Sequence, residues 1–282
     1  MCIRLHFNST CRKKGEVKKG TVLILLTACI LFLSCGDDGP LDTGDHVKNT
    51  DFVAEETVSF QVAVIDHIRL RLEAINGNVS IAGISGANAV DIIGEKRVGS
   101  ESMSDAQEHL QWLEVIVQHS ADEIYVKTIQ PQETHGRSYA IDYTITLPPD
   151  LEALIENVNG VVTIAEINNL VSVMNINGLV ALNEILGSAQ VALVNGQIES
   201  EVTLPLDGTI GMSTVNGMIE LHIPQSTSAE FSATVGNGVI SLSNLDLQDQ
   251  VSSSNSLSGT LGEGQGTISL NTGNGNIIVT GF

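Results

Sequence analysis

Histidine and acidic side chains are the residues of this sequence that could carry acid–base or metal chemistry, and their spacing supports neither. Three acids, Glu199, Glu201 and Glu220, could offer oxygen ligands to Ca²⁺, but the dense oxygen-rich loop of a calcium site is absent. The seven histidines are isolated along the chain and show no metal-ligand spacing: His6, His46, His67, His109, His119, His135 and His222. We therefore expect no metal, no cofactor and no catalytic residue.

The distribution of charge narrows the classes of partner. The chain has 13 Lys and Arg against 33 Asp and Glu, and residues 138–282 contain no Lys or Arg at all. Nucleic-acid binding needs clustered Lys and Arg, so we expect no nucleic-acid partner. The same region lacks the basic residue that a polysaccharide-cleaving enzyme built on stacked β-strands would use for catalysis.

Cys35 is the one residue for which the sequence indicates a covalent modification. Six of the 13 basic residues lie within residues 1–35, and the apolar run Thr21 to Leu33 is too short to span a bilayer. The run ends in Leu33-Ser34-Cys35, which resembles the bacterial lipobox, although Phe32 departs from the usual small aliphatic residue. The alternative is an ordinary secretory signal with a chance cysteine.

The lipobox resemblance implies cleavage before Cys35 and acylation of that residue. We predict a lipoprotein signal peptide at 1–34, a flexible tether at 35–54 and a β-domain at 55–282. All four cysteines lie in the first 35 residues, so the mature domain would hold no disulfide. The expected location is the cell envelope, with the lipid in the outer membrane and the domain on its periplasmic or surface face.

A repeated Asn-Gly pair is the strongest pattern in the β-domain. Counting from each Asn, the residue at −4 is apolar and the residue at +3 is Val or Ile in every unit, with polar or small residues mostly between them. This alternation predicts two short strands joined by a corner, and Asn and Gly supply the positive φ that a tight corner needs. The seven pairs are Asn76-Gly77, Asn159-Gly160, Asn177-Gly178, Asn195-Gly196, Asn216-Gly217, Asn237-Gly238 and Asn274-Gly275.

The spacing of the repeat is compatible with two architectures. Neighbouring pairs in the main array are 18, 18, 21, 21 and 37 residues apart, and Asn255 within the last gap indicates a degenerate unit. A parallel β-solenoid with coils of 18–21 residues needs the same residue at the same offset in every coil. A meander of Asn-Gly hairpins fits the same apolar positions. The recurrence of identical corners favours an all-β solenoid.

Residues 94–139 interrupt the repeat. Ser104-Asp105-Ala106-Gln107 resembles a helix capping box, and two alternating segments, Glu114 to Gln118 and Glu123 to Thr128, follow it. We predict a small helix and a hairpin that cover one end or side of the strands, in preference to a separate binding module. At the other end, the strand 276–279 almost reaches the C-terminus, which predicts an open edge through which copies could associate.

The run Thr214-Val215-Asn216-Gly217-Met218-Ile219 and its relatives resemble the bacterial adhesin-like domain with repeated T-V-N-G-x-I units, of the auto-transporter adhesin head type. The resemblance covers about residues 55 to 282 and implies a right-handed parallel β-solenoid with no established activity. We expect a non-enzymatic envelope lipoprotein that contacts a protein or a surface glycan. The alternatives are a structural protein that forms homo-oligomers through its solenoid ends and, less favoured, a polysaccharide-active enzyme.

Overall fold

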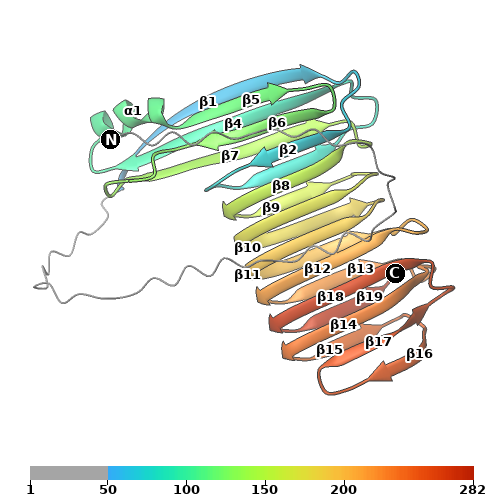
Figure 1. The fold of residues 1–282 in the computed structure, drawn as a ribbon. Coiled ribbons are helices and arrows are strands. Elements are labelled where there is room, and N and C mark those ends of the chain that lie inside the picture. The colour runs from blue at the N-terminus through green and yellow to red at the C-terminus, as the bar shows by residue number, and fades with distance from the viewer. Residues whose placement is uncertain (1–49) are drawn as a thin grey trace, which may run out of the picture. The chain divides into compact units, whose positions relative to one another are not determined.

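A computed structural model describes residues 50–282, and the predicted signal peptide and Cys35 lie outside these residues. The described part is all-β, with nineteen strands, one α-helix and one short 3₁₀ helix (Figure 1). The first strand, β1 (Phe52–Ala63), begins inside the segment predicted as tether. Its start precedes the predicted domain boundary by three residues.

Each Asn-Gly unit contains one strand arm before the corner and one after it. In two units a single strand runs through both arms: β10 (Val171–Ile185) and β11 (Ala189–Val202). In the others the arms are β2 (Arg69–Glu73) and β3 (Val79–Gly83), β8 (Glu152–Asn159) and β9 (Val162–Ala165), β12 (Thr209–Asn216) and β13 (Ile219–Ile223), β14 (Ala229–Asn237) and β15 (Ile240–Ser243), and β18 (Gly266–Asn274) and β19 (Ile277–Gly281).

The units pair with one another in parallel, and their corners are in register. Asn177 of β10 lies opposite Asn195 of β11, which lies opposite Asn216 of β12. Among the residues that the structure describes, the two arms of a unit pair with other units and not with each other. A meander of Asn-Gly hairpins, which requires antiparallel pairing within a unit, is therefore excluded.

The order of the units in space departs from their order in the chain. β18 lies between β12 and β14, and β19 lies between β13 and β15 (Figure 1). The expectation that strand 276–279 forms an open end is thus wrong. Its two sides are occupied by β13 and β15, because the chain returns into the sheet after an excursion beyond β14.

That excursion is a hairpin, so the prediction of a degenerate unit at Asn255 is also wrong. The strands β16 (Leu247–Ser252) and β17 (Ser256–Leu261) are antiparallel to each other, and β17 is antiparallel to β14. Asn255 lies in the turn between β16 and β17. Without the glycine that follows Asn in every other unit, this segment makes a reversing turn.

The interruption at 94–139 contains the predicted helix and hairpin, and the hairpin is hydrogen-bonded into the sheet. The helical residues are α1 (Met103–His109) and the 3₁₀ helix η1 (Leu110–Trp112), followed by the antiparallel pair β5 (Glu114–His119) and β6 (Glu123–Ile129). Gly94, the predicted start of the interruption, lies within β4 (Ala89–Ser100). β6 pairs in parallel with β2, and β7 (Ser138–Leu147) pairs in parallel with β3 and antiparallel with β4, which also pairs with β1.

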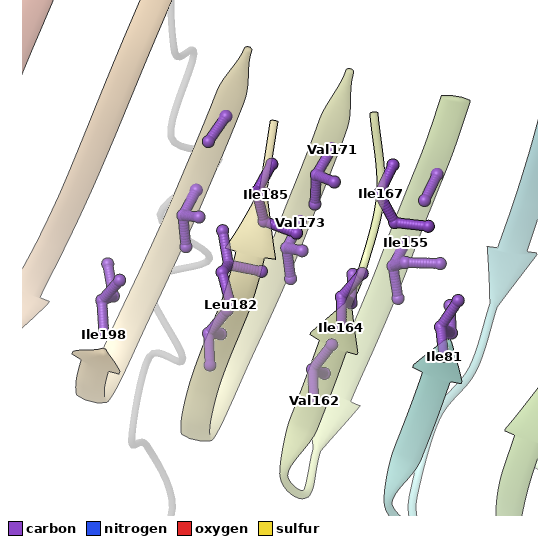
Figure 2. Packing of buried hydrophobic residues seen from close by; sticks show 14 of the residues in the cluster. Ile81, Ile155, Val162, Ile164, Ile167, Val171, Val173, Leu182, Ile185 and Ile198 are labelled. Carbon is purple, nitrogen blue, oxygen red and sulfur yellow. The ribbon is translucent and has the colours of Figure 1, made fainter. Parts of the chain in front are cut away.

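The core lies between the arms before and after the corners. Figure 2 shows Ile155, Val173, Leu182 and Ile198 pointing into this space from successive units. The residues at −4 and +3 are buried in every unit except at Ile240, which is half-buried. Burying an aliphatic side chain of this size stabilises a fold by about 1.5–3 kcal/mol, so the repeat is held together chiefly by packing between units.

Candidate functional site

The corner asparagines form one continuous ladder of side-chain hydrogen bonds. Six of the seven donate through Nδ2 to the Oδ1 of the neighbouring asparagine, as in the 2.8 Å bond from Asn177 to Asn159. Asn76, at one end of the ladder, only accepts within it and donates instead to the Tyr139 carbonyl at 3.1 Å. The other five bonds measure 2.7 to 3.0 Å. In spatial order the ladder is Asn76, Asn159, Asn177, Asn195, Asn216, Asn274 and Asn237. All seven asparagines named from the sequence lie in it.

The glycine of each corner is required by two independent constraints. The φ of Gly196 is +139°, a conformation that side chains with a Cβ rarely adopt. A Cβ on Gly196 would also lie 1.7 Å from the carbonyl oxygen of Gly178 in the neighbouring unit. The glycines therefore allow the units to approach closely enough for the asparagine bonds to form.

Buried polar side chains lie inside the corners, at the position two residues before each Asn in four units. Asn175 Nδ2 donates to the Gly160 carbonyl at 3.1 Å, and Thr272 Oγ1 donates to the Gly217 carbonyl at 2.9 Å. Asn157 and Thr214 occupy the same position and are buried as well. Sequence reasoning missed these residues. The sequence could have identified them, because side chains alternate along a strand and the −2 position therefore lies on the same face as the apolar −4 position.

Aliphatic side chains form a column beside the asparagine ladder, at the position just before each Asn. Ile176, Val194 and Val215 are 43%, 39% and 52% exposed. The column consists of Ile75, Val158, Ile176, Val194 and Val215, and we call it the apolar column. Because the corner asparagines are in register, these side chains are stacked from unit to unit. The column ends where Gly273 and Gly236 take this position.

Every basic residue in 50–282 is paired with a carboxylate. Arg71 contacts Glu73 and Glu156 at 2.8 and 3.0 Å, and Lys127 contacts Glu73 at 3.0 Å. The remaining pairs are Arg69 with Glu152, Lys96 with Glu56, Arg97 with Asp142 and Arg137 with Asp105. These residues therefore present no free basic patch that could bind phosphate.

Two of the histidines named above, His6 and His46, lie outside the described residues, and within residues 50–282 the other histidines and the three acids form no metal-binding cluster. Glu199 lies opposite Glu220, and Glu201 lies opposite His222, on the neighbouring strands β11 and β13. Within residues 50–282 no group of three His, Cys, Asp or Glu side chains could hold a metal ion. His67 and His119 contact each other edge to face, with ring centroids 5.9 Å apart.

Two hollows of similar size lie at opposite ends of the sheet. One, of about 650 Å³, lies beside β1 and β5 and is lined by Phe60, His67 and Val117, among others. The other, of about 620 Å³, lies between β15 and the β16–β17 hairpin. No helix among residues 50–282 has the length and hydrophobicity needed to cross a membrane.

The parallel, in-register corners define a repeat protein of the all-β class, with a ladder of hydrogen-bonded asparagines along its corners. The family model described as Toastrack DUF4097 matches residues 53–280, and the chain belongs to this family. No curated protein is significantly similar to the sequence.

The solved structures that are similar to this chain are distant in sequence. A proposed cell adhesion protein from Clostridium sporogenes is 13% identical, with 81% of this chain and 100% of that chain covered and a TM-score of 0.46. A proposed adhesin from Bacteroides fragilis is 13% identical, with 79% and 97% covered and a TM-score of 0.35. A proposed adhesin from Parabacteroides merdae is 10% identical, with 79% and 96% covered and a TM-score of 0.32.

Proposed function

We propose that this protein is a non-enzymatic lipoprotein of the cell envelope, anchored through Cys35, whose repeat units wind as coils of a β-solenoid and present a surface for adhesion or protein contact. The observation that carries this proposal is the apolar column. Beside the asparagine ladder, Ile176, Val194 and Val215 are exposed and aligned on one side of the corners. Aligned exposed aliphatic side chains are a feature of interaction surfaces.

The solenoid geometry and the anchor have separate support. In-register parallel pairing of identical corners is what stacked coils require. The basic segment, the apolar run and the cysteine of residues 1–35 occur in the order of a lipoprotein signal. The contact surface itself would accept a protein or a neutral glycan, because each basic residue within 50–282 is already paired with a carboxylate.

Replacing the exposed part of the apolar column tests the contact function. We expect Ile176→Ser combined with Val194→Ser and Val215→Ser, made in the lipid-free Cys35→Ser protein, to weaken binding to delipidated envelope fragments by about tenfold, since interface aliphatic residues contribute roughly 1 kcal/mol or less each. The measurement is a sedimentation binding isotherm with a labelled protein.

The matched control makes three changes of the same kind away from the column. Ile65, Ile84 and Leu206 are exposed and lie in loops. Their joint replacement by serine should leave binding unchanged. Equal binding by the wild type and the column variant, with the same melting temperature, would show that the apolar column is not the contact surface.

A further inference from the structure

The edge strand β15 (Ile240–Ser243) has only one neighbour. It pairs with β19, and among residues 50–282 no strand pairs with its other side. The arm before the same corner is different, because β17 pairs with β14 and β16 pairs with β17. The β16–β17 hairpin thus extends one side of the core, while the position next to β15 on the other side is left unfilled.

The backbone of β15 is oriented to accept another strand at this position. The Val239 carbonyl accepts a hydrogen bond from the Ile277 amide at 3.0 Å, so Val239 and Ser241 face β19. Backbone groups alternate sides along a strand, which directs the N–H and C=O of Ile240 and Leu242 to the open side. These are the groups through which an added strand would pair.

The side chains next to the open edge form an incomplete core. The residues equivalent to Ile240 and Leu242 in β13 and β19 are fully buried, whereas Ile240 and Leu242 themselves are only half-buried. They line the hollow of about 620 Å³ together with Leu245, Leu247 and Leu257. A strand with apolar residues at alternate positions would pair with β15 and complete the burial of these side chains.

The neighbouring edge strand β16 carries protection that β15 lacks. β16 has an irregular register between Gln248 and Val251 and a positive φ at Asp249, and bulges and charges of this kind block pairing by further strands. β15 has the sequence Ile-Ser-Leu-Ser, with no proline, no charge and no break in register. Of the two edges, the structure leaves β15 free to pair.

Charge selects among the strands that could fill this position. The charged residue that lines the hollow is Asp246, and residues 138–282 contain no Lys or Arg. A second copy would bring the same acidic surface, and the segment 36–45 of this chain carries four aspartates and no basic residue. A segment flanked by Lys or Arg would instead be attracted.

We propose that the open edge of β15 binds an extended segment of a partner protein, with alternating apolar residues and basic flanks, by adding it as a strand. This inference rests on the proposed contact function and assigns it a second surface, distinct from the apolar column. The apolar column is tested by binding to envelope fragments, so a peptide that does not bind at β15 would not change the outcome of that test.

The probe is a fluorescein-labelled capped peptide, Lys-Lys-Val-Thr-Val-Thr-Val-Lys-Lys, titrated against the full chain and followed by anisotropy. We expect saturable binding that weakens by about tenfold or more in Leu242→Lys, because an inward-pointing charge blocks strand addition. The matched control is Ser241→Lys, which adds the same charge to the same strand on its exposed face and should bind within about threefold of wild type. A peptide with Glu in place of Lys, and one with Pro in place of the central Val, should not bind.

Hydrogen exchange on the wild-type protein provides a test that does not depend on the folding of a variant. Peptide should slow exchange at the amides of Ile240 and Leu242. Absence of peptide binding, unchanged binding by Leu242→Lys, or protection confined to other strands would overturn the proposal. Light scattering that shows dimers abolished by Leu242→Lys would also overturn it, since the occupant would then be a second copy.

Discussion

At the scale of single residues, each corner allows neighbouring units to stack, and most of the residues responsible can be recognised in the sequence. The offset from each Asn to its apolar neighbours predicts which side chains are buried, and those at −4 are buried in all seven units. The hydrogen bonds between asparagine side chains of neighbouring units could be anticipated only in part, because the sequence does not identify the partner of each side chain. Which asparagine meets which depends on the order of the units in space.

Removing one asparagine from the middle of the ladder should destabilise the fold. Asn216 donates to Asn195 and accepts from Asn274, both at 2.9 Å. We expect Asn216→Ala to lower the free energy of unfolding by about 1 kcal/mol or more, because two exposed hydrogen bonds are lost. Urea denaturation measures the change.

Asn271 provides the control for that substitution. It is an exposed asparagine of β18 with no side-chain partner among residues 50–282. Asn271→Ala should therefore leave the urea midpoint nearly unchanged. If both variants unfold at the same urea concentration as wild type, the ladder contributes no measurable stability.

At the scale of elements, alternation predicts the arms of each unit well, and local signals place the helix less accurately. The side chain that caps α1 is Ser102, whose Oγ accepts a hydrogen bond from the Asp105 amide at 3.2 Å. The sequence pointed instead to Ser104 as the first residue of a capping box. Asp105 is occupied elsewhere, because Arg137 binds its carboxylate through two hydrogen bonds of 2.6 and 2.7 Å.

The Asp105 contacts make the attachment of α1 dependent on pH. Arg137 and, next, the Ser100 hydroxyl hold the pKa of the Asp105 carboxyl well below its ordinary value. A carboxyl with a lowered folded-state pKa stabilises the fold above its unfolded-state pKa of about 4, and that stabilisation is lost as pH falls through the folded-state pKa. Asp105→Asn should melt at a lower temperature than wild type at pH 7.

The difference between wild type and Asp105→Asn should narrow as the pH falls below about 4, because the Asp105 carboxyl of the unfolded state is protonated first and the stability of the folded wild type falls with it. Thermal melts across this range follow the change. Asp91→Asn, on the same strand as Ser100, is the comparison and should behave as wild type. A melting difference that is constant with pH would mean that the ion pair does not account for the effect of the substitution.

At the scale of the whole molecule, the order of the units is the feature that sequence could not provide. The corners are nearly identical, so each unit is compatible with several neighbours, and the periodicity carries no information about which pair forms. The last unit is consequently found between β12 and β14 rather than at an end. This arrangement moves the open edge from strand 276–279 to β15, where the hollow beside Ile240 and Leu242 lies.

The central claim is that this ladder acts at a membrane to which lipid on Cys35 holds it. Metabolic labelling with a palmitate analogue, followed by fractionation, tests that claim most directly. We predict that wild type and Cys29→Ser are labelled and lie in the membrane fraction, whereas Cys35→Ser is unlabelled and leaves it. An unlabelled wild type, or Cys35→Ser that stays with the membrane, would contradict the account.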